Sequence, residues 1–215
     1  PSPTTAVVVG LLLLLSGLLL YRGNNNLTVL AHICVLVGAL MGSGGLIVWS
    51  DGSLVSILVV STIFAIGSVL ASSALLSSLA MLALSASVGA GSGYSNASYF
   101  LVIKEPLITI LLFSAVTAVL FYWSKRLPPD RSRVAIVAAR TGVLVINFGF
   151  WVGSLWGDRI GSEGMIIHDW FFALAWAVVL IAAAAWAWKQ NLRWLLNTAA
   201  VFLGIHFYTQ WFEYL

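Results

Sequence analysis

The sequence predicts an all-α protein, a polytopic transmembrane helix bundle of about eight spans with its N-terminus outside. Of its 215 residues, 61% are hydrophobic and only 8% are charged, and the mean hydropathy is +1.03. A soluble domain carries about 25% charged residues, so this chain could not cover a globule of its size with polar surface. Apolar runs of nearly the length that crosses a bilayer recur along the chain, and basic residues fall at alternate breaks between them.

The first half of the chain contains four apolar runs, expected as spans at about 5–21, 27–49, 53–70 and 74–91. The first run has no basic segment before it and no small-residue cleavage site after it, which favours a span over a signal peptide. Residues 22–26 form a polar turn and Asp51-Gly52 a tight one. The break at residues 71–73 is the weakest, so 53–91 is either two short spans or one bent helix.

The second half contains four more runs, expected at about 101–123, 134–156, 166–188 and 192–214. A Gly/Ser/Asn loop at 89–98 precedes them, and the break at 125–133 contains Pro128-Pro129, which a helix interior does not tolerate. All eight spans belong to one transmembrane domain over residues 1–215. The chain begins without methionine and its last residues still read as helix. We therefore expect both ends to be incomplete, with a truncation at the C-terminus.

Lysine and arginine positions predict the orientation. One set of alternate loops carries Arg22, then the four basic residues of the 124–133 loop, then Lys189 with Arg193. The other set carries mainly acidic or balanced residues, such as Asp51, Asp158 and Glu163. Cytoplasmic loops of membrane proteins are enriched in basic residues. We therefore expect the 124–133 loop to be cytoplasmic.

Composition excludes several function classes. The net charge of +3 fits this positive-inside bias, and no basic cluster is large enough to follow a phosphate backbone, so nucleic-acid binding is not expected. The single cysteine, Cys34, lies in an apolar run and reads as a buried hydrophobe. No nucleophile elbow, phosphate loop or zinc-protease motif occurs, which disfavours an enzyme. Many of the ten tryptophans lie near span ends, as in an aromatic belt.

The span at 134–156 carries a polar stripe at helical spacing, formed by Arg140, Asn147, Trp151, Ser154 and Asp158. Ionisable groups within spans are candidates for a transport path. Arg140 is also near enough to the basic loop for its guanidinium to reach the headgroups.

Glycines at four-residue spacing favour close helix packing rather than a permeation path. They lie in the second and sixth predicted spans: Gly38, Gly42, Gly149, Gly153 and Gly157.

The last helix places His206, Gln210 and Glu213 on one face, which extends the candidate polar path of Arg140 and Asn147. His168 and His206 lie toward the same side of the membrane, so a haem between two histidines is conceivable. Their depths differ by on the order of 8 Å, which fits one flat macrocycle poorly. Histidine pairs at metal-binding spacing and paired cysteines are both missing from the sequence, so we predict no metal site and no cofactor, with haem or pigment left open as alternatives.

The stretch Asn197-Thr-Ala-Ala-Val-Phe-Leu-Gly-Ile-His-Phe-Tyr-Thr-Gln-Trp-Phe-Glu213 resembles a signature of a family of uncharacterised bacterial multi-pass membrane proteins. The resemblance covers this helix well, and elsewhere only the run of spans and short loops. The resemblance implies a protein of the bacterial inner membrane and does not indicate any biochemical activity.

Three function classes follow. The first is a non-catalytic membrane subunit or scaffold that packs against lipids and other membrane proteins, favoured by small-residue faces, short loops and few intramembrane charges. The second is a small-solute or ion transporter that uses the polar path. The third is a membrane redox or pigment-associated subunit, which would need the histidines as cofactor ligands.

Overall fold

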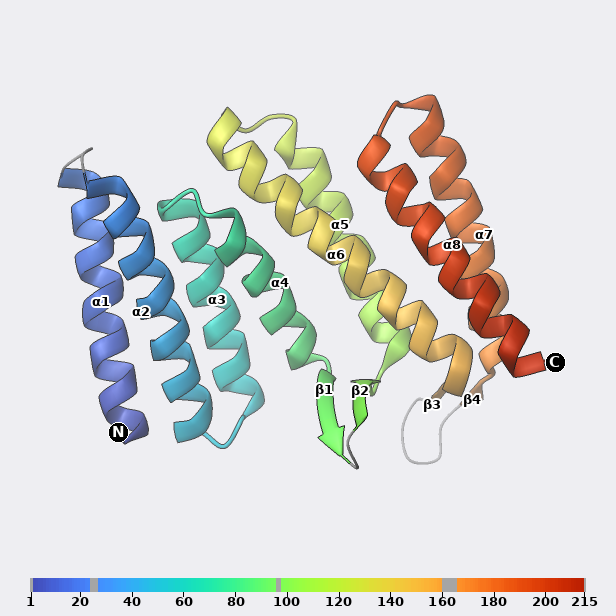
Figure 1. Ribbon diagram of the computed structural model, residues 1–215, viewed down its shortest axis with the longest axis horizontal. Helices are drawn as coiled ribbons and strands as arrows, with labels where there is room; N and C mark the ends of the chain where they lie inside the picture. The colour runs from blue at the N-terminus through green and yellow to red at the C-terminus, as the bar shows by residue number, and fades with distance from the viewer. Residues whose placement is uncertain (1, 24–26, 96–97, 160–165, 215) are drawn as a thin grey trace. The chain divides into compact units, whose positions relative to one another are not determined.

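The computed structural model describes residues 2–23, 27–95, 98–159 and 166–214. Within these ranges the chain forms eight α-helices and two short antiparallel hairpins (Figure 1). The predicted polar turn at 24–26 and Glu163 lie outside the described residues. Five of the described helices are long and apolar enough to cross a membrane, so the prediction of an all-helical membrane protein is confirmed at that level.

The chain divides into two compact units. Unit 1 comprises Pro1–Val88 and Ser114–Val143, and unit 2 comprises Gly89–Phe113 and Leu144–Leu215. Both units contain part of the helices α5 (Pro106–Ser124) and α6 (Pro129–Trp156). The sequence alone did not indicate this division within the one predicted domain.

Unit 1 begins with α1 (Pro3–Gly23) and α2 (Thr28–Trp49), which pack with their backbones in close contact. A Cβ atom added to Gly10 would lie 2.3 Å from the Gly42 nitrogen, and one added to Gly38 would lie 2.4 Å from the Leu14 nitrogen. Real Cβ atoms do not approach backbone this closely, so only glycine fits at these two positions. Small residues permit such close approach between membrane helices.

The helices α3 (Leu54–Leu70) and α4 (Ala74–Ser87) are separate, which resolves the alternative of one bent helix. Ser72 between them has a φ of 49°, in the left-handed region that cannot continue a helix. The Ser73 side chain then accepts a hydrogen bond from the Leu76 backbone N–H and caps α4. Ser53 caps α3 in the same way.

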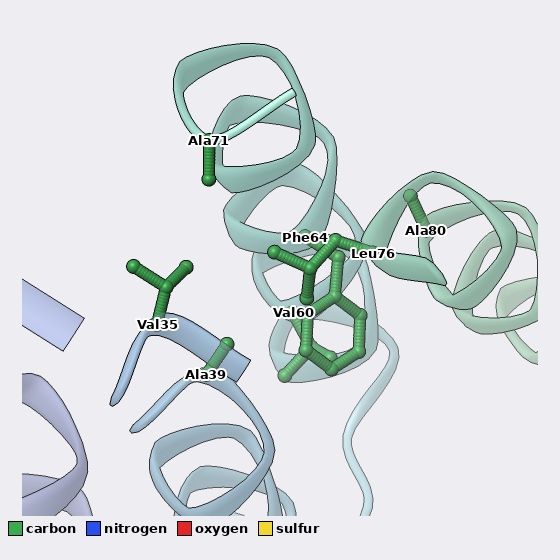
Figure 2. Packing of buried hydrophobic residues seen from close by; sticks show 7 residues of the cluster. All are labelled: Val35, Ala39, Val60, Phe64, Ala71, Leu76 and Ala80. Atoms are coloured by element: carbon green, nitrogen blue, oxygen red, sulfur yellow. The ribbon is translucent and has the colours of Figure 1, made fainter. Parts of the chain in front are cut away.

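A hydrophobic cluster joins α2, α3 and α4 (Figure 2). The labelled side chains in Figure 2 come from these three helices and from the residue that directly follows α3, Ala71: Val35, Ala39, Val60, Phe64, Ala71, Leu76 and Ala80. His32 forms polar contacts at one end of this cluster. Its Nδ1 lies 2.7 Å from the Thr28 carbonyl, and its Nε2 lies 3.0 Å from the Ala71 carbonyl. The imidazole therefore connects the start of α2 to the end of α3.

Unit 2 contains the two hairpins and the helices α7 (Asp169–Lys189) and α8 (Arg193–Tyr214). Strands β1 (Ala90–Ser95) and β2 (Ser98–Ile103) pair antiparallel, and so do β3 (Asp158–Arg159) and β4 (Ile166–Ile167). The core of this unit includes Trp176 and Phe172 of α7, Phe150 of α6 and Phe202 of α8.

The hairpins correct two predicted helix starts. Residues 101–103 are strand, and α5 begins only at Pro106, where proline suits the first turn of a helix and disfavours helix in the residue before it. Residues 166–167 are also strand, and α7 begins at Asp169. The fourth helix ends at Ser87 rather than at 91, and Gly89 has a left-handed φ of 86°. Finally, α6 begins at Pro129, five residues before its predicted start.

Candidate functional site

A polar and aromatic cluster joins α6, α7 and α8 within unit 2, and Trp176 lies at its centre. The Trp176 side chain is 0% exposed, and its Nε1 donates a hydrogen bond to Oδ1 of Asn147 at 3.0 Å. A buried indole N–H needs an acceptor, because leaving it unpaired costs free energy of folding. This bond ties the middle of α6 to α7.

His206 of α8 packs against the same indole. The two ring centroids are 5.0 Å apart and the rings meet edge to face at 77°. Phe202, one turn earlier on α8, also contacts Trp176, with 6.3 Å between centroids. Trp176 therefore contacts α6 through its N–H and α8 through its ring.

A second bond joins α6 directly to α8. Nε1 of Trp151 donates to Oγ1 of Thr209 at 3.2 Å, and the Thr209 hydroxyl donates to the Ile205 carbonyl at 2.7 Å. Trp151 lies one turn after Asn147 on α6. Two successive turns of α6 thus bond to two different neighbouring helices.

Two buried polar atoms in this cluster lack a hydrogen-bond partner among the described residues. They are Nδ1 of His206 and Nε2 of Gln210, and their residues are one turn apart on α8. An unpaired buried polar group costs about 1–3 kcal/mol. These two atoms therefore keep hydrogen-bonding capacity within the cluster: the Gln210 amide nitrogen can donate to a small polar solute, and an unprotonated His206 Nδ1 can accept a proton or a hydrogen bond.

The structure brings together only part of the predicted polar path. Asn147 and His206 contact the same indole, and Gln210 is half-buried one turn further along α8. Arg140 and Glu213 are exposed. Their place in a path remains a prediction.

The two histidines proposed as haem ligands lie at different levels. His168 is exposed and directly precedes α7, whereas His206 contacts Trp176, eight residues further along α7. At about 1.5 Å per residue this separates their levels by about 12 Å. In the described part of the chain no group of three or more His, Cys, Asp or Glu side chains could hold a metal ion.

Asp158 holds a buried position that the sequence did not reveal. Its side chain is 3% exposed, and Oδ2 accepts a hydrogen bond of 2.7 Å from the Leu107 backbone N–H in the first turn of α5. A carboxylate at a helix N-terminus is stabilised by unpaired N–H groups and by the helix dipole. The last polar residue of the predicted stripe therefore caps a neighbouring helix.

The predicted packing glycines of α6 lie against neighbouring helices of unit 2. A Cβ on Gly149 would meet Ile110 of α5 at 3.0 Å, and one on Gly153 would meet Phe172 of α7 at 2.7 Å. Gly157 lies beyond the end of α6 with a φ of 67°, where it ends the helix in a conformation that favours glycine.

Trp176 and Thr209 are the cluster residues that sequence reasoning missed. Tryptophan near a span end is explained by the membrane interface, but Trp176 is the eighth residue of α7 and far from both helix ends. An indole at that depth requires an internal acceptor. This requirement was the signal that could have paired it with Asn147.

Comparison of the chain with models of known protein families, with curated proteins and with solved structures finds no match. The resemblance of residues 197–213 to a bacterial membrane-protein family therefore remains a prediction.

Proposed function

We propose that the protein is a non-catalytic subunit or scaffold of a membrane complex, packing against other membrane proteins. The observation that carries this proposal is that polar side chains within the apolar helices form hydrogen bonds to other helices of the same chain. Asn147, Trp151 and His32 bond or lie close to groups on neighbouring helices of this chain. Ser61 similarly donates to the Ala80 carbonyl and Thr141 to the Ser78 hydroxyl. Polar groups used in this way join helices rather than line an aqueous path.

The outer faces of the helices support the same proposal. On α8, large apolar and aromatic side chains are exposed at Phe207, Tyr208, Trp211 and Phe212, and α7 exposes Trp170 and Leu174. In a membrane such faces contact either lipid or another helix.

Purification of the tagged full chain from its natural membrane in mild detergent tests the subunit proposal. We expect a second membrane protein to elute with it in a fixed ratio, at a mass well above the 23.1 kDa of one chain. An unrelated multi-pass protein with the same tag and expression level is the control. Elution of the protein alone as a stable monomer would contradict the proposal.

We infer further that all eight helices cross the membrane, with the N-terminus outside and the 124–133 loop in the cytoplasm of a bacterium. Lys125 and Arg126 lie in the turn after α5, and Arg131 and Arg133 lie at the start of α6. All four support this orientation. The helices α3 and α4 are apolar but shorter than the other spans, and α8 is long but richer in polar side chains.

A specific observation favours transport as a second candidate function. His206 Nδ1 and Gln210 Nε2, whose residues are one turn apart on α8, have no hydrogen-bond partner among the described residues, so the imidazole can accept a proton and the amide can donate to a small polar solute. In proteoliposomes that contain a pH-sensitive dye, His206→Ala should then lower proton flux at least tenfold. The exposed neighbour Phe207→Ala should leave the flux unchanged. Equal flux through both variants would remove the transport proposal.

A further inference from the structure

Unit 1 contains an open groove between α3, α4, α5 and α6, with a volume of about 410 Å³. We call it the α3–α6 groove. Its wall includes Ala65 of α3, Met81 of α4, Val116 of α5 and Ala138 of α6. Sites for small molecules have volumes of about 300–1,000 Å³, so the groove has room for one extended apolar chain.

The wall of the groove is apolar in practice, although three serines contribute to it. The Ser61 hydroxyl donates to the Ala80 carbonyl at 2.9 Å, Ser68 donates to the Ala65 carbonyl at 2.7 Å, and Ser77 donates to the Ala74 carbonyl at 2.7 Å. Each hydroxyl is therefore already bonded to backbone. A ligand with polar groups along its length would find few hydrogen-bond partners here and would lose free energy when those groups leave water. A hydrocarbon chain has no polar groups and avoids this cost.

One end of the groove is basic. Arg131, in the first turn of α6, is exposed and belongs to the groove lining. Lys125, Arg126 and Arg133 lie within a few residues of it and are exposed, and Asp130 is the one acidic residue of the segment 124–133. Lys125 and Arg126 also lie over the rings of Phe121 and Tyr122, which holds them close to the helix end. The groove thus joins an apolar wall to a positively charged end.

The length of the groove matches the outer part of one bilayer leaflet. Its lining covers residues 131–138 of α6 and 77–84 of α4, about 10 Å along each helix. The hydrocarbon of one leaflet is about 15 Å deep. A chain that fills the groove would place its headgroup beside Arg131.

We propose that the α3–α6 groove binds one acyl chain of an anionic phospholipid, with the lipid phosphate paired to Arg131. Basic residues beside a cleft between membrane helices are the pattern that recognises anionic headgroups. This proposal does not depend on the subunit function, because a monomer or a transporter with the same groove would bind the lipid equally well.

The charge requirement is tested by lipid binding to the purified full chain in detergent, measured by native mass spectrometry. The probes are phosphatidylglycerol and phosphatidylcholine with identical acyl chains. We expect phosphatidylglycerol to bind the wild-type protein at least fivefold more tightly. Arg131→Gln should lose about fivefold in phosphatidylglycerol affinity, since one basic residue near the membrane surface contributes about this factor.

Arg133→Gln is the matched control, because it removes the same charge two residues later, outside the groove lining. We expect it to retain the wild-type preference. Equal binding of the two lipids by the wild-type protein, or equal losses in the two arginine variants, would overturn the proposal.

The groove itself is tested by filling it. Ala65 is exposed within the groove, so Ala65→Phe places a ring there without entering the core. We expect at least tenfold weaker binding of both lipids, whereas Ala118→Phe, exposed on α5 outside the lining, should bind as wild type. Circular dichroism and the thermal midpoint establish that each variant is folded, and Ala65→Leu replaces the larger substitution if it is not.

Soluble glycerol phosphate separates a lipid site from a simple phosphate site. Millimolar glycerol phosphate should not displace phosphatidylglycerol, because the acyl chain supplies most of the binding. Full displacement by the headgroup alone, or wild-type binding by a folded Ala65→Phe or Ala65→Leu variant, would contradict the groove.

Discussion

Asp158 illustrates how one buried side chain positions two segments of unit 2. Its Oδ2 accepts the Leu107 N–H, and its Oδ1 has no hydrogen-bond partner in the part of the chain that the structure describes. The residue belongs to β3, so a single carboxylate joins the second hairpin to the start of α5.

We expect Asp158→Ala to lower the free energy of unfolding by about 1–3 kcal/mol, because the half-buried Leu107 N–H loses its acceptor. Asp158→Asn keeps an acceptor and should lose less. Thermal unfolding in detergent micelles measures both. Asp130→Asn, exposed in the first turn of α6, is the control and should cost less than about 1 kcal/mol. An Asp158→Ala variant as stable as this control would contradict the capping role.

The Asn147–Trp176 bond is the second prediction at this scale. A double-mutant cycle with Asn147→Ala and Trp176→Phe should give a coupling free energy of about 0.6 kcal/mol and at most about 1.7, the range found for hydrogen bonds between membrane helices. Trp170→Phe, an exposed residue on the same helix, should show no coupling to Asn147→Ala. A coupling within error of zero for the first pair would show that the bond does not stabilise the fold.

Single residues of the site were only partly predictable from the sequence. Asn147 and His206 stood out because polar side chains are rare in apolar helices. Their common neighbour Trp176 did not, because tryptophan is ordinary in membrane proteins and periodicity within one helix does not identify the helix it faces. The cap formed by Asp158 depends on a contact across 51 residues of sequence, which no local pattern encodes.

At the level of the helices, the close packing of α1 against α2 gives the most specific prediction about stability. Gly38→Ala places a Cβ atom 2.4 Å from the Leu14 nitrogen, so the two helices must move apart. We expect the free energy of unfolding to fall by about 1–3 kcal/mol.

The matched control for Gly38→Ala lies on the same helix. Gly44 has open space around its Cα, so Gly44→Ala should be neutral or stabilise the protein by up to about 1 kcal/mol through helix propensity. Equal stability of the two alanine variants would contradict the close backbone contact of α1 with α2.

Hydropathy predicted the eight helices because each one is an apolar run of at least 14 residues, and such runs are the strongest local signal. The main errors lie at residues 88–91, where the fourth helix has already ended, and at 101–105 and 166–168, which precede a helix. The short apolar stretches 101–103 and 166–167 do not by themselves distinguish strand from helix. Pro106 could have indicated where α5 begins, because proline is common in the first turn of a helix. Residues 134–156 were placed correctly, yet the first turn from Pro129 was taken for a loop because it is charged.

For the whole molecule, the orientation proposal predicts the result of topology reporters. Alkaline phosphatase, which is active only outside the cytoplasm, and green fluorescent protein, which is fluorescent only inside, can be inserted into the 124–133 loop and after residue 157. We expect fluorescence alone at the first position and phosphatase activity alone at the second, because one span separates them. The same reporter active at both positions would mean that α6 does not cross the membrane.

The lengths of α3 and α4 have a consequence for the surrounding lipid. Their 17 and 14 residues reach about 26 Å and about 21 Å, whereas the hydrocarbon core measures about 30 Å. If both cross the membrane, the bilayer beside them must become thinner, at a cost of a fraction of a kcal/mol per ångström of mismatch. The protein should therefore gather in thinner regions of a membrane, and vesicles made from shorter-chain lipids should accept it more readily than vesicles made from longer-chain lipids.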